Sequence, residues 1–312
     1  MKTYLVTGGA GFIGSHIATH LIQQGHQVVI LDNLSTGREE NIPEGAQFIK
    51  MDLADLKQYR LLKDISAEAV FHLAGQSSGE ISFADPWYDF QSHVVSTFHL
   101  LTYCREKNIK RFLYASSMSV YGDPETLPVK EEDPLQPKSF YGTGKSSAEN
   151  YIRFFQGLGV ETTILRFFNV YGPGQNLDNM RQGMASIYLA FMLKGQPIQV
   201  KGSKDRFRDF LYIDDLVSGW MKAYQAEAAF GKTYNLCSGV KTTVEDLIEL
   251  LKTAYGDPDY PTEYLKGTPG DQFGLYGDNS VIINELGWSP QTSLERGLSA
   301  MVEHAKKGVS VG

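Results

Sequence analysis

The 312-residue chain has few cysteines and no excess of basic charge. Its two cysteines, Cys104 and Cys237, have no CxxC neighbour, which argues against a disulfide framework and favours buried thiols in a reducing compartment. Lys and Arg number 29 against 36 Asp and Glu, so the net charge of −7 disfavours general nucleic-acid binding. We therefore expect a cytoplasmic globular protein that makes no use of nucleic acid.

Long apolar runs and metal-ligand clusters are also missing. Residues 3–31 carry no Asp, Glu, Lys or Arg, but glycines, histidines and glutamines interrupt them, so we expect no membrane span and no signal peptide. His16 and His20 stand four residues apart without a visible third ligand, so the sequence predicts no metal site. Hydrophobic residues at 42% and charged residues at 21% are ordinary for a globular protein.

Short β-branched runs alternate with longer amphipathic segments in the first half of the chain, which predicts a doubly wound parallel α/β sheet, a Rossmann fold. The predicted strands are Thr3–Thr7, Gln27–Leu31, Ala46–Met51, Ala69–Leu73, Arg111–Ala115 and Val160–Arg166. The predicted helices of this half are Phe12–Gln24, Asp55–Lys63, Trp87–Lys107 and Ser139–Gln156.

The alternation loosens after Asn169, where turn residues become frequent. We expect helices near Arg181–Lys194, Ile213–Gln225, Thr243–Ala254 and Ser293–Ala305. The predicted organisation is a dinucleotide-binding domain over residues 1–168, to which a segment near 209–237 returns. A second, smaller α/β domain for the substrate is expected over residues 169–208 and 238–312.

A glycine-rich turn joins the first predicted strand to the first predicted helix. Gly8, Gly11 and Gly14 have the spacing at which a tight turn brings backbone N–H groups and a helix N-terminus to a pyrophosphate. Asp32 ends the second strand, where a carboxylate binds the ribose hydroxyls of NAD and repels the 2′-phosphate of NADP. NAD is therefore favoured, although Arg38 lies six residues further on. Asp52 and Leu53 follow the third strand, where an adenine edge is expected.

Three polar residues indicate proton transfer at an alcohol. Tyr141 and Lys145 are four residues apart at the start of a predicted helix, which places them on one face. An ammonium near a phenol stabilises the phenolate and lowers the pKa of the tyrosine. Ser117 ends the fifth strand, at the sheet edge where ligands bind in this architecture. Together these residues predict acid–base chemistry coupled to hydride transfer with a nicotinamide.

At this point the sequence resembles the extended short-chain dehydrogenase/reductases, and within them the nucleotide-sugar epimerase/dehydratase branch. It is most similar there to the UDP-glucose 4-epimerases. The resemblance runs nearly from end to end and rests on TGGAGFIGSH (7–16), LDNLSTG (31–37), VFHLAGQ (70–76), SSMSVYGDP (116–124), YGTGK (141–145), RFFNVYGPGQ (166–175), RDFLYIDDL (208–216) and YNL (234–236).

The resemblance implies a transient oxidation at sugar C4, with hydride returned to the opposite face. Tyr141 would be the general base, Lys145 would hold the nicotinamide ribose and Ser117 would bind the 4-oxygen. The second domain would bind a nucleotide-diphosphate sugar, with a UDP-sugar favoured, and a homodimer would form through the helices that contain Trp87 and Tyr141. Cofactor contacts are expected from Gly8, Gly11, Phe12, Ile13, Gly14, Asp32, Asn33, Asp52, Leu53, Leu73, Ala74, Gly75, Tyr141, Lys145 and Phe168.

On the substrate side, the resemblance assigns Ser117 to the sugar and Asn169 and Arg208 to the diphosphate. Asp271 matches the acid of the family's R-x-G-D segment, but Thr268 occupies the arginine position. Arg181, Lys201 and Lys266 are candidates to replace that missing arginine. Two further departures lie near the cofactor. Ser77, assigned to the substrate, stands where a lysine is frequent, and His93 stands where an asparagine is usual.

Three functions remain open at this stage. The first is an NAD-dependent nucleotide-sugar 4-epimerase. The second is a dehydratase, a reductase or an epimerase at another carbon, although Met118 and Ser119 stand where sugar 4,6-dehydratases carry acids. The third is a nucleotide sensor without enzymatic activity, against which the presence of Ser117, Tyr141 and Lys145 argues.

Overall fold

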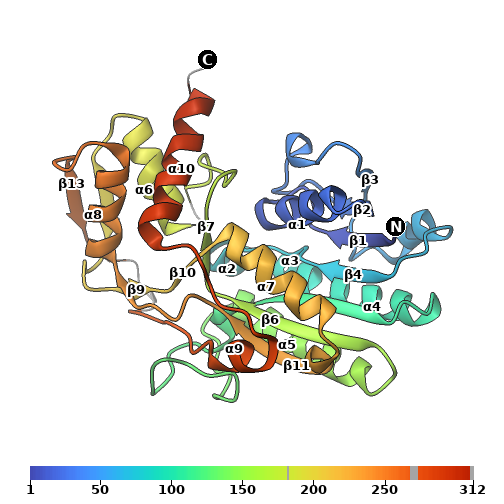
Figure 1. Cartoon of the computed structure of the whole chain (residues 1–312). Helices are drawn as coiled ribbons and strands as arrows, with labels where there is room; N and C mark the ends of the chain where they lie inside the picture. The colour runs from blue at the N-terminus through green and yellow to red at the C-terminus, as the bar shows by residue number, and fades with distance from the viewer. Residues whose placement is uncertain (181–182, 268–272, 310–312) are drawn as a thin grey trace.

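A seven-stranded parallel sheet forms the centre of the molecule, in a computed structural model that describes residues 1–180, 183–267 and 273–309 (Figure 1). The strand order is β11-β6-β5-β4-β1-β2-β3, so the winding direction reverses between β1 and β4. A reversal of this kind opens a crevice at the carboxyl ends of the strands. The strands are β1 (Thr3–Thr7), β2 (Gln27–Asp32), β3 (Gln47–Lys50), β4 (Ala69–His72), β5 (Arg111–Ser117), β6 (Glu161–Phe167) and β11 (Lys232–Leu236).

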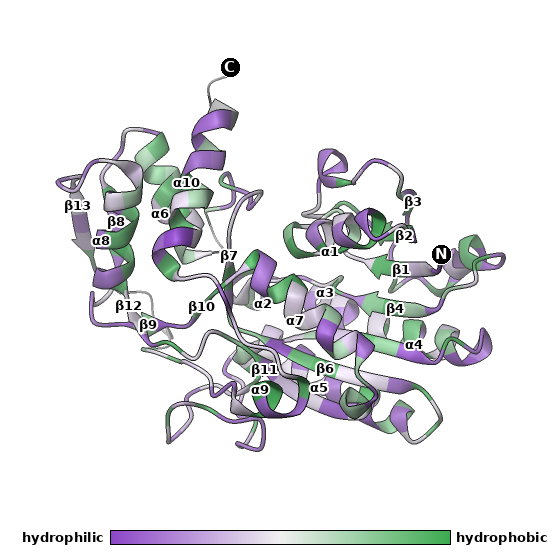
Figure 2. Ribbon diagram, in the orientation of Figure 1, coloured by the Kyte–Doolittle hydropathy of each residue, from purple (hydrophilic) through white to green (hydrophobic). Residues whose placement is uncertain are grey.

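Helices cover both faces of this sheet, which explains why the strands are continuously apolar. Tyr4 and Val6 of β1 join a core with the helices of one face, whereas Leu5 joins a separate core on the other face. Figure 2 shows the apolar segments of β1 and β4 in green between these layers. The first face holds α1 (Phe12–Gln23), α7 (Ile213–Gln225) and α9 (Ser280–Leu286), and the second holds α4 (Ser96–Glu106) and α5 (Phe140–Gln156).

A smaller group of elements lies to one side of the sheet and has its own hydrophobic core (Figure 1). Its helices are α6 (Met184–Leu193), α8 (Val244–Tyr255) and α10 (Leu294–Val309). Three two-stranded sheets accompany the central sheet within the described residues. They pair β7 (Asn169–Tyr171) with β10 (Phe210–Tyr212), β8 (Ile198–Lys201) with β13 (Thr262–Leu265), and β9 (Phe207–Arg208) with β12 (Thr242–Thr243).

The doubly wound parallel sheet predicted from the sequence is confirmed. The domain boundaries stay a prediction, although β11 does join the sheet beside β6. None of the helices within the described ranges is long and apolar enough to cross a membrane.

Two predicted helices differ from the observed ones. Residues Leu56–Leu62 form a 3-10 helix rather than an α-helix. The long helix expected over Trp87–Lys107 begins as α3 (Pro86–Phe90), with Pro86 in its first turn, and passes through a π-helical turn at Gln91–Val95 before α4. A short helix not expected from the sequence, α2 (Gly79–Ala84), precedes it. The π-helical turn lies directly against the beginning of α5, which brings it to the site described next.

Candidate active site

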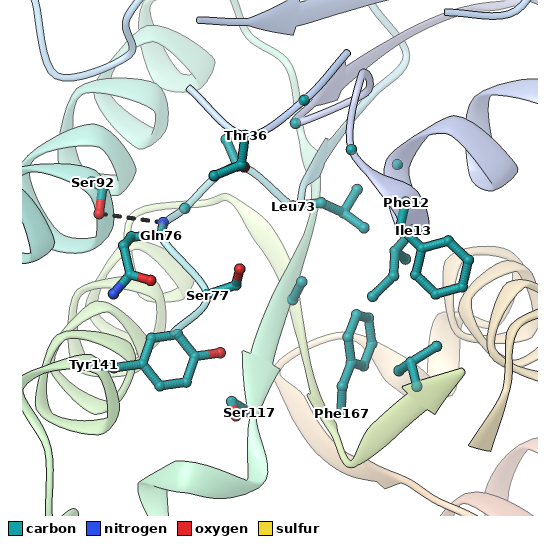
Figure 3. A pocket seen from close by; sticks show the side chains of 18 of the residues that line it. Phe12, Ile13, Thr36, Leu73, Gln76, Ser77, Ser92, Ser117, Tyr141 and Phe167 are labelled. Atoms are coloured by element: carbon teal, nitrogen blue, oxygen red, sulfur yellow. Dashed lines mark hydrogen bonds between the residues drawn. The ribbon is translucent and has the colours of Figure 1, made fainter. Parts of the chain in front are cut away.

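A cavity of about 400 Å³ extends along the carboxyl ends of the strands, from the glycine-rich turn to the beginning of α5. Figure 3 shows its two ends, with Phe12 and Ile13 on one side and Tyr141 and Ser117 on the other. Every residue that the sequence assigned to the cofactor lines this one cavity, as do Ser117, Ser77 and Asn169 from the substrate assignment. The winding of the sheet therefore gathers positions from 8 to 169 into one site.

The glycine-rich turn has no room for side chains at Gly8 and Gly14. Gly8 has φ of +68°, in the left-handed region that favours glycine. A Cβ on Gly14 would lie 2.2 Å from the carbonyl oxygen of Gly8, and a Cβ on Gly11 would lie 3.2 Å from the same atom. Because the backbone lines the cavity directly and α1 begins there with no acidic residue in its first turn, the turn fits a dinucleotide pyrophosphate.

A buried carboxylate stands at the end of β2. Asp32 accepts hydrogen bonds from the backbone N–H groups of Ala10, at 3.0 Å, and Leu34, at 2.8 Å, and it lines the cavity. Arg38, the nearby cation that kept NADP in consideration, donates instead to Asp178, at 2.7 Å, and to Glu40, at 3.2 Å. A cation paired in this way adds little attraction for a 2′-phosphate, so the cofactor end of the cavity fits NAD.

At the other end, Ser139 caps α5 and places Tyr141 and Lys145 on the face toward the sheet. The Ser139 hydroxyl accepts a hydrogen bond of 3.1 Å from the N–H of Gly142. The Lys145 ammonium donates to the carbonyl oxygen of Ala115 at 2.8 Å and lies 6.0 Å from the centre of the Tyr141 ring. Ser117, at the end of β5, completes the group.

Burial changes the acidity of both α5 side chains. It lowers the pKa of Lys145 to about 8, against the opposing charges of Asp89 and Glu149. It raises the pKa of Tyr141, whereas the hydrogen bond with Ser117 lowers it. The sequence predicted a lowered pKa for Tyr141, and that prediction is wrong, because burial raises the pKa of the phenol. At 6.0 Å from the ring centre, the ammonium does not offset the loss of solvation around the phenol.

The residues assigned to the substrate diphosphate are only partly gathered. Asn169 lines the cavity and donates to the carbonyl oxygen of Asp209 at 3.0 Å. Arg208 is buried beside this site but outside the described cavity lining, where it donates to the carbonyl oxygens of Phe207, at 2.8 Å, and Phe273, at 3.2 Å. Burial lowers the pKa of Arg208 to about 10. Arg181, Asp271 and Thr268 lie outside the described residues.

Several residues at the site were missed in the sequence analysis. Arg206 is buried near Arg208, and the two positive charges interact. Asp89 is buried and its charge acts on Tyr141, and the only sequence signal for it is its position four residues before His93. The cavity lining also includes polar side chains to which the sequence analysis assigned no binding role, namely Gln76, Tyr88, Ser119, Gln175, Asn176 and Asn179.

Comparisons with known proteins agree with this geometry. The UDP-glucose 4-epimerase of Mycolicibacterium smegmatis is 35% identical over 97% of this chain and 98% of that protein. The crystal structure of a UDP-glucose 4-epimerase from Thermotoga maritima with UDP-glucose superimposes with a TM-score of 0.94, at 34% identity over 98% of this chain and 99% of that one.

A relative that is named for a different reaction is also similar to this chain over most of its length. UDP-glucuronic acid decarboxylase 1 of Arabidopsis thaliana is 32% identical over 96% of this chain and 68% of that protein. The family model that describes the NAD dependent epimerase/dehydratase family matches residues 4–237, which include the glycine-rich turn, Ser117, Tyr141 and Lys145. The chain is therefore a member of the NAD-dependent epimerase/dehydratase family.

Proposed function

We propose that the protein is a nucleotide-sugar 4-epimerase that acts on a UDP-sugar. The observation that supports this most is the meeting of Ser117, Tyr141 and Lys145 at one end of the cavity whose other end is the phosphate-binding turn. A sugar bound beside Tyr141 would have its ring next to the nicotinamide of a dinucleotide whose pyrophosphate lies at the glycine-rich turn. Two relatives named as UDP-glucose 4-epimerases support the same reaction.

In the proposed mechanism, Tyr141 removes the proton from the sugar 4-hydroxyl, because the phenolate oxygen is the basic atom at this end of the cavity. When bound, NAD⁺ would supply a hydride acceptor for C4 and, once reduced, a hydride donor for the opposite face of the 4-keto sugar. Ser117 hydrogen-bonds the 4-oxygen, and Lys145 stabilises the phenolate and holds the nicotinamide ribose. Tyr141 then returns the proton to the 4-oxygen, so that proton and hydride are both conserved.

The lining of the cavity favours epimerisation over elimination. Loss of water across C5 and C6 needs an acid to protonate the leaving hydroxyl, and a base for the C5 proton. The acidic side chains in the described lining, Asp32 and Asp52, are both at the cofactor end. Met118 and Ser119 follow Ser117, and neither side chain is a carboxylic acid. A 4-keto sugar would therefore keep its 6-hydroxyl and be reduced again.

The substrate diphosphate is assigned to Asn169 and Arg208, with Arg181 as a further cation, and the nucleotide ribose is assigned to Asp271. We assign Ser77 to the sugar, because it lines the cavity near Tyr141 (Figure 3). The buried pair Arg206 and Arg208 supports an anionic group nearby, because two adjacent buried cations are stabilised by a diphosphate.

Product analysis tests this function. The purified protein would be incubated with catalytic NAD and a panel of UDP-, dTDP-, GDP- and CDP-sugars, and the products identified by mass spectrometry and NMR. We expect a UDP-sugar product of unchanged mass with the opposite configuration at C4. Loss of water or carbon dioxide would replace the proposal with a dehydratase or decarboxylase.

We also infer that two copies associate through α2–α5 and that the protein is cytoplasmic. Exposed aromatic side chains gather on these helices, and we call them the aromatic patch. Phe98 packs on Tyr151 at 5.6 Å between ring centres, and Phe83 packs on Phe140 at 5.7 Å. Such a patch is typical of a surface that a partner covers. The patch comprises Phe83, Trp87, Phe90, Phe98, Phe140, Tyr151 and Phe154. The buried free thiols of Cys104 and Cys237 are consistent with a reducing compartment.

A further inference from the structure

Close to Tyr141, but outside the described cavity lining, lie two buried titratable side chains that the proposed mechanism does not use. Asp89, on α3, and His93, in the π-helical turn, are each 1% exposed. The Nε2 atom of His93 lies 3.6 Å from Oδ1 of Asp89. Neither residue belongs to the described cavity lining, so neither is placed to touch a ligand.

His93 packs directly against the reacting tyrosine. Its ring centre is 5.3 Å from that of Tyr141, and the two planes are inclined at 70°, which is an edge-to-face contact. Two glycines leave the room for this contact. A Cβ on Gly75 would lie 2.6 Å from Cε1 of His93, and a Cβ on Gly144 would lie 3.2 Å from its Cβ. The imidazole therefore fills a space that the surrounding backbone shapes closely.

The imidazole has unused polar capacity. In the part of the chain that the structure describes, no side chain hydrogen-bonds a ring nitrogen of His93, and the group that interacts with the ring is the backbone of Gln76, which raises the pKa of the imidazole. A buried polar group without a partner costs stability, so its retention needs a reason. Burial and the Lys145 charge lower the pKa of His93 well below its ordinary value, so the ring is neutral. A neutral ring with a proton on Nε2 directs that N–H toward Asp89.

Asp89 supplies a negative charge to the same group. Its Oδ1 accepts a hydrogen bond of 2.9 Å from Nε2 of Gln76, and burial raises its pKa. The carboxylate raises the pKa values of both Tyr141 and Lys145. The other titratable side chains that act on Asp89, His93, Tyr141 or Lys145 from neighbouring elements are His72 of β4, Tyr114 of β5 and Glu149 of α5.

We propose that Asp89 and His93 act together as a positioning pair beside the active site: the neutral imidazole holds the Tyr141 ring in place, and the carboxylate orients the imidazole and balances the buried charge of Lys145. The pair transfers no proton to the substrate. This inference rests on the proposed acid–base role of Tyr141, and it holds for whichever reaction that tyrosine begins.

The charge of Asp89 is tested with Asp89→Asn, which keeps the shape of the side chain. We expect both limbs of the pH profile of kcat to move to lower pH, with KM within about twofold of wild type, because the carboxylate raises two pKa values and touches no ligand. Asp85→Asn is the matched control, since Asp85 is exposed and an asparagine still caps α3. An unmoved profile in folded Asp89→Asn would overturn the proposal.

The imidazole is tested with His93→Ala and His93→Phe. We expect the alanine variant to lose about tenfold in kcat, the lower range for a misplaced catalytic group, with KM unchanged. His93→Phe keeps a ring edge against Tyr141 and should recover most of that loss. A folded alanine variant with wild-type kcat, or a phenylalanine variant as slow as the alanine variant, contradicts the positioning role.

A measurement without turnover separates this proposal from the proposed function. Nitrogen-15 NMR of labelled wild-type protein should show His93 neutral, protonated on Nε2 alone and unchanged from about pH 5.5 to 9. If His93 titrates in that range, or if its proton is on Nδ1, the proposed positioning role of Asp89 and His93 is refuted. This holds even if the protein is inactive on every sugar. A dehydratase product, in contrast, would refute the proposed 4-epimerase activity. The proposal for Asp89 and His93 would remain, because the same kinetic tests can then be made on the dehydratase reaction.

Discussion

Tyr141 stands among groups that change the stability of its phenolate in opposite directions. Burial and the Asp89 carboxylate raise its pKa, whereas the hydrogen bond with Ser117 lowers it. With these groups alone, the phenol is protonated near neutral pH. The positive nicotinamide ring of a bound oxidised dinucleotide would favour the phenolate, so formation of the base is coupled to occupancy of the cofactor site.

Removal of the phenol oxygen tests the general base. We expect Tyr141→Phe to lower kcat by at least about 10²-fold, the scale of a lost acid–base group, while the variant still binds NAD. Tyr151→Phe is the matched control, because it removes the same atom from the same helix at a residue that is 42% exposed. Steady-state kinetics and NAD titration check both. A Tyr141→Phe variant with wild-type turnover would remove the tyrosine from the mechanism.

The ammonium of Lys145 predicts an alkaline limit to activity. Because burial lowers its pKa to about 8, Lys145 loses its proton as the pH rises through that value, and the phenolate then loses its stabilising charge. We expect kcat/KM to fall above about pH 8. Lys145→Arg, which stays charged, should show a lower plateau without this fall. A wild-type profile that stays flat from about pH 7 to 9.5 would contradict the assignment.

At the scale of single residues, the sequence predicted the cofactor side better than the substrate side. Apart from Tyr141 and Lys145 on α5, the residues assigned to NAD stand next to strand ends or at the glycine-rich turn and the helix that it begins, and all of the assigned residues line the cavity. His93 was noted only as an unusual residue. Its relation to Asp89 depends on the packing of α3 and the π-helical turn against α5, and no spacing in the chain indicates that packing.

The turn between β1 and α1 depends on the absence of side chains. In Gly14→Ala the new methyl group would lie 2.2 Å from the Gly8 carbonyl oxygen, so the turn must open. We expect a loss of about 1–3 kcal/mol in stability and weaker NAD binding, measured by urea unfolding and by titration. Gly79→Ala is the control, since no atom lies within 4 Å of the place that its methyl group would take. Equal effects of the two variants would contradict this role.

A buried ion pair joins α5 to β6 beneath the active site. Arg166 and Arg153 both bind Oε2 of Glu149, at 2.8 and 2.7 Å, but their side chains are 2% and 41% exposed. We expect Arg166→Met to cost about 3–5 kcal/mol in unfolding free energy, because it leaves a buried carboxylate poorly compensated. Arg153→Met should cost at most about 1 kcal/mol, because the Arg153 side chain is 41% exposed and Arg166 still pairs with the carboxylate. Urea unfolding that gives similar losses would contradict this difference.

At the scale of helices and strands, local sequence patterns predicted the elements that pack along the central sheet, because their apolar residues repeat at regular intervals. The Ile213–Gln225 helix was predicted with its observed bounds, since its apolar face repeats regularly against β6 and β7. The π-helical turn at Gln91–Val95 was not predicted, because the extra residue in that turn is stabilised by contacts with α5 and not by local propensity. The short helices α2 and α9 have too few turns to show a period.

The aromatic patch predicts how whole molecules associate. Phe154 is 67% exposed and Trp87 is 65% exposed, and both belong to the surface that we assign to a second copy. Phe154→Glu with Trp87→Glu should give a monomer, because a charge on each side of the twofold interface opposes burial. Light scattering after size-exclusion chromatography measures this. A monomeric wild type would contradict the proposed dimer, and so would a double variant that remains dimeric.

The position of β11 at the edge of the sheet has a consequence for synthesis of the protein on the ribosome. β6 ends at Phe167, and its outer partner begins only at Lys232, about 65 residues later. At roughly 5–20 residues per second, the nascent chain carries β6 with an unpaired edge for about 3–13 s. An open parallel edge can pair with another chain, so this interval is when translation speed and chaperones matter most for the yield of soluble protein.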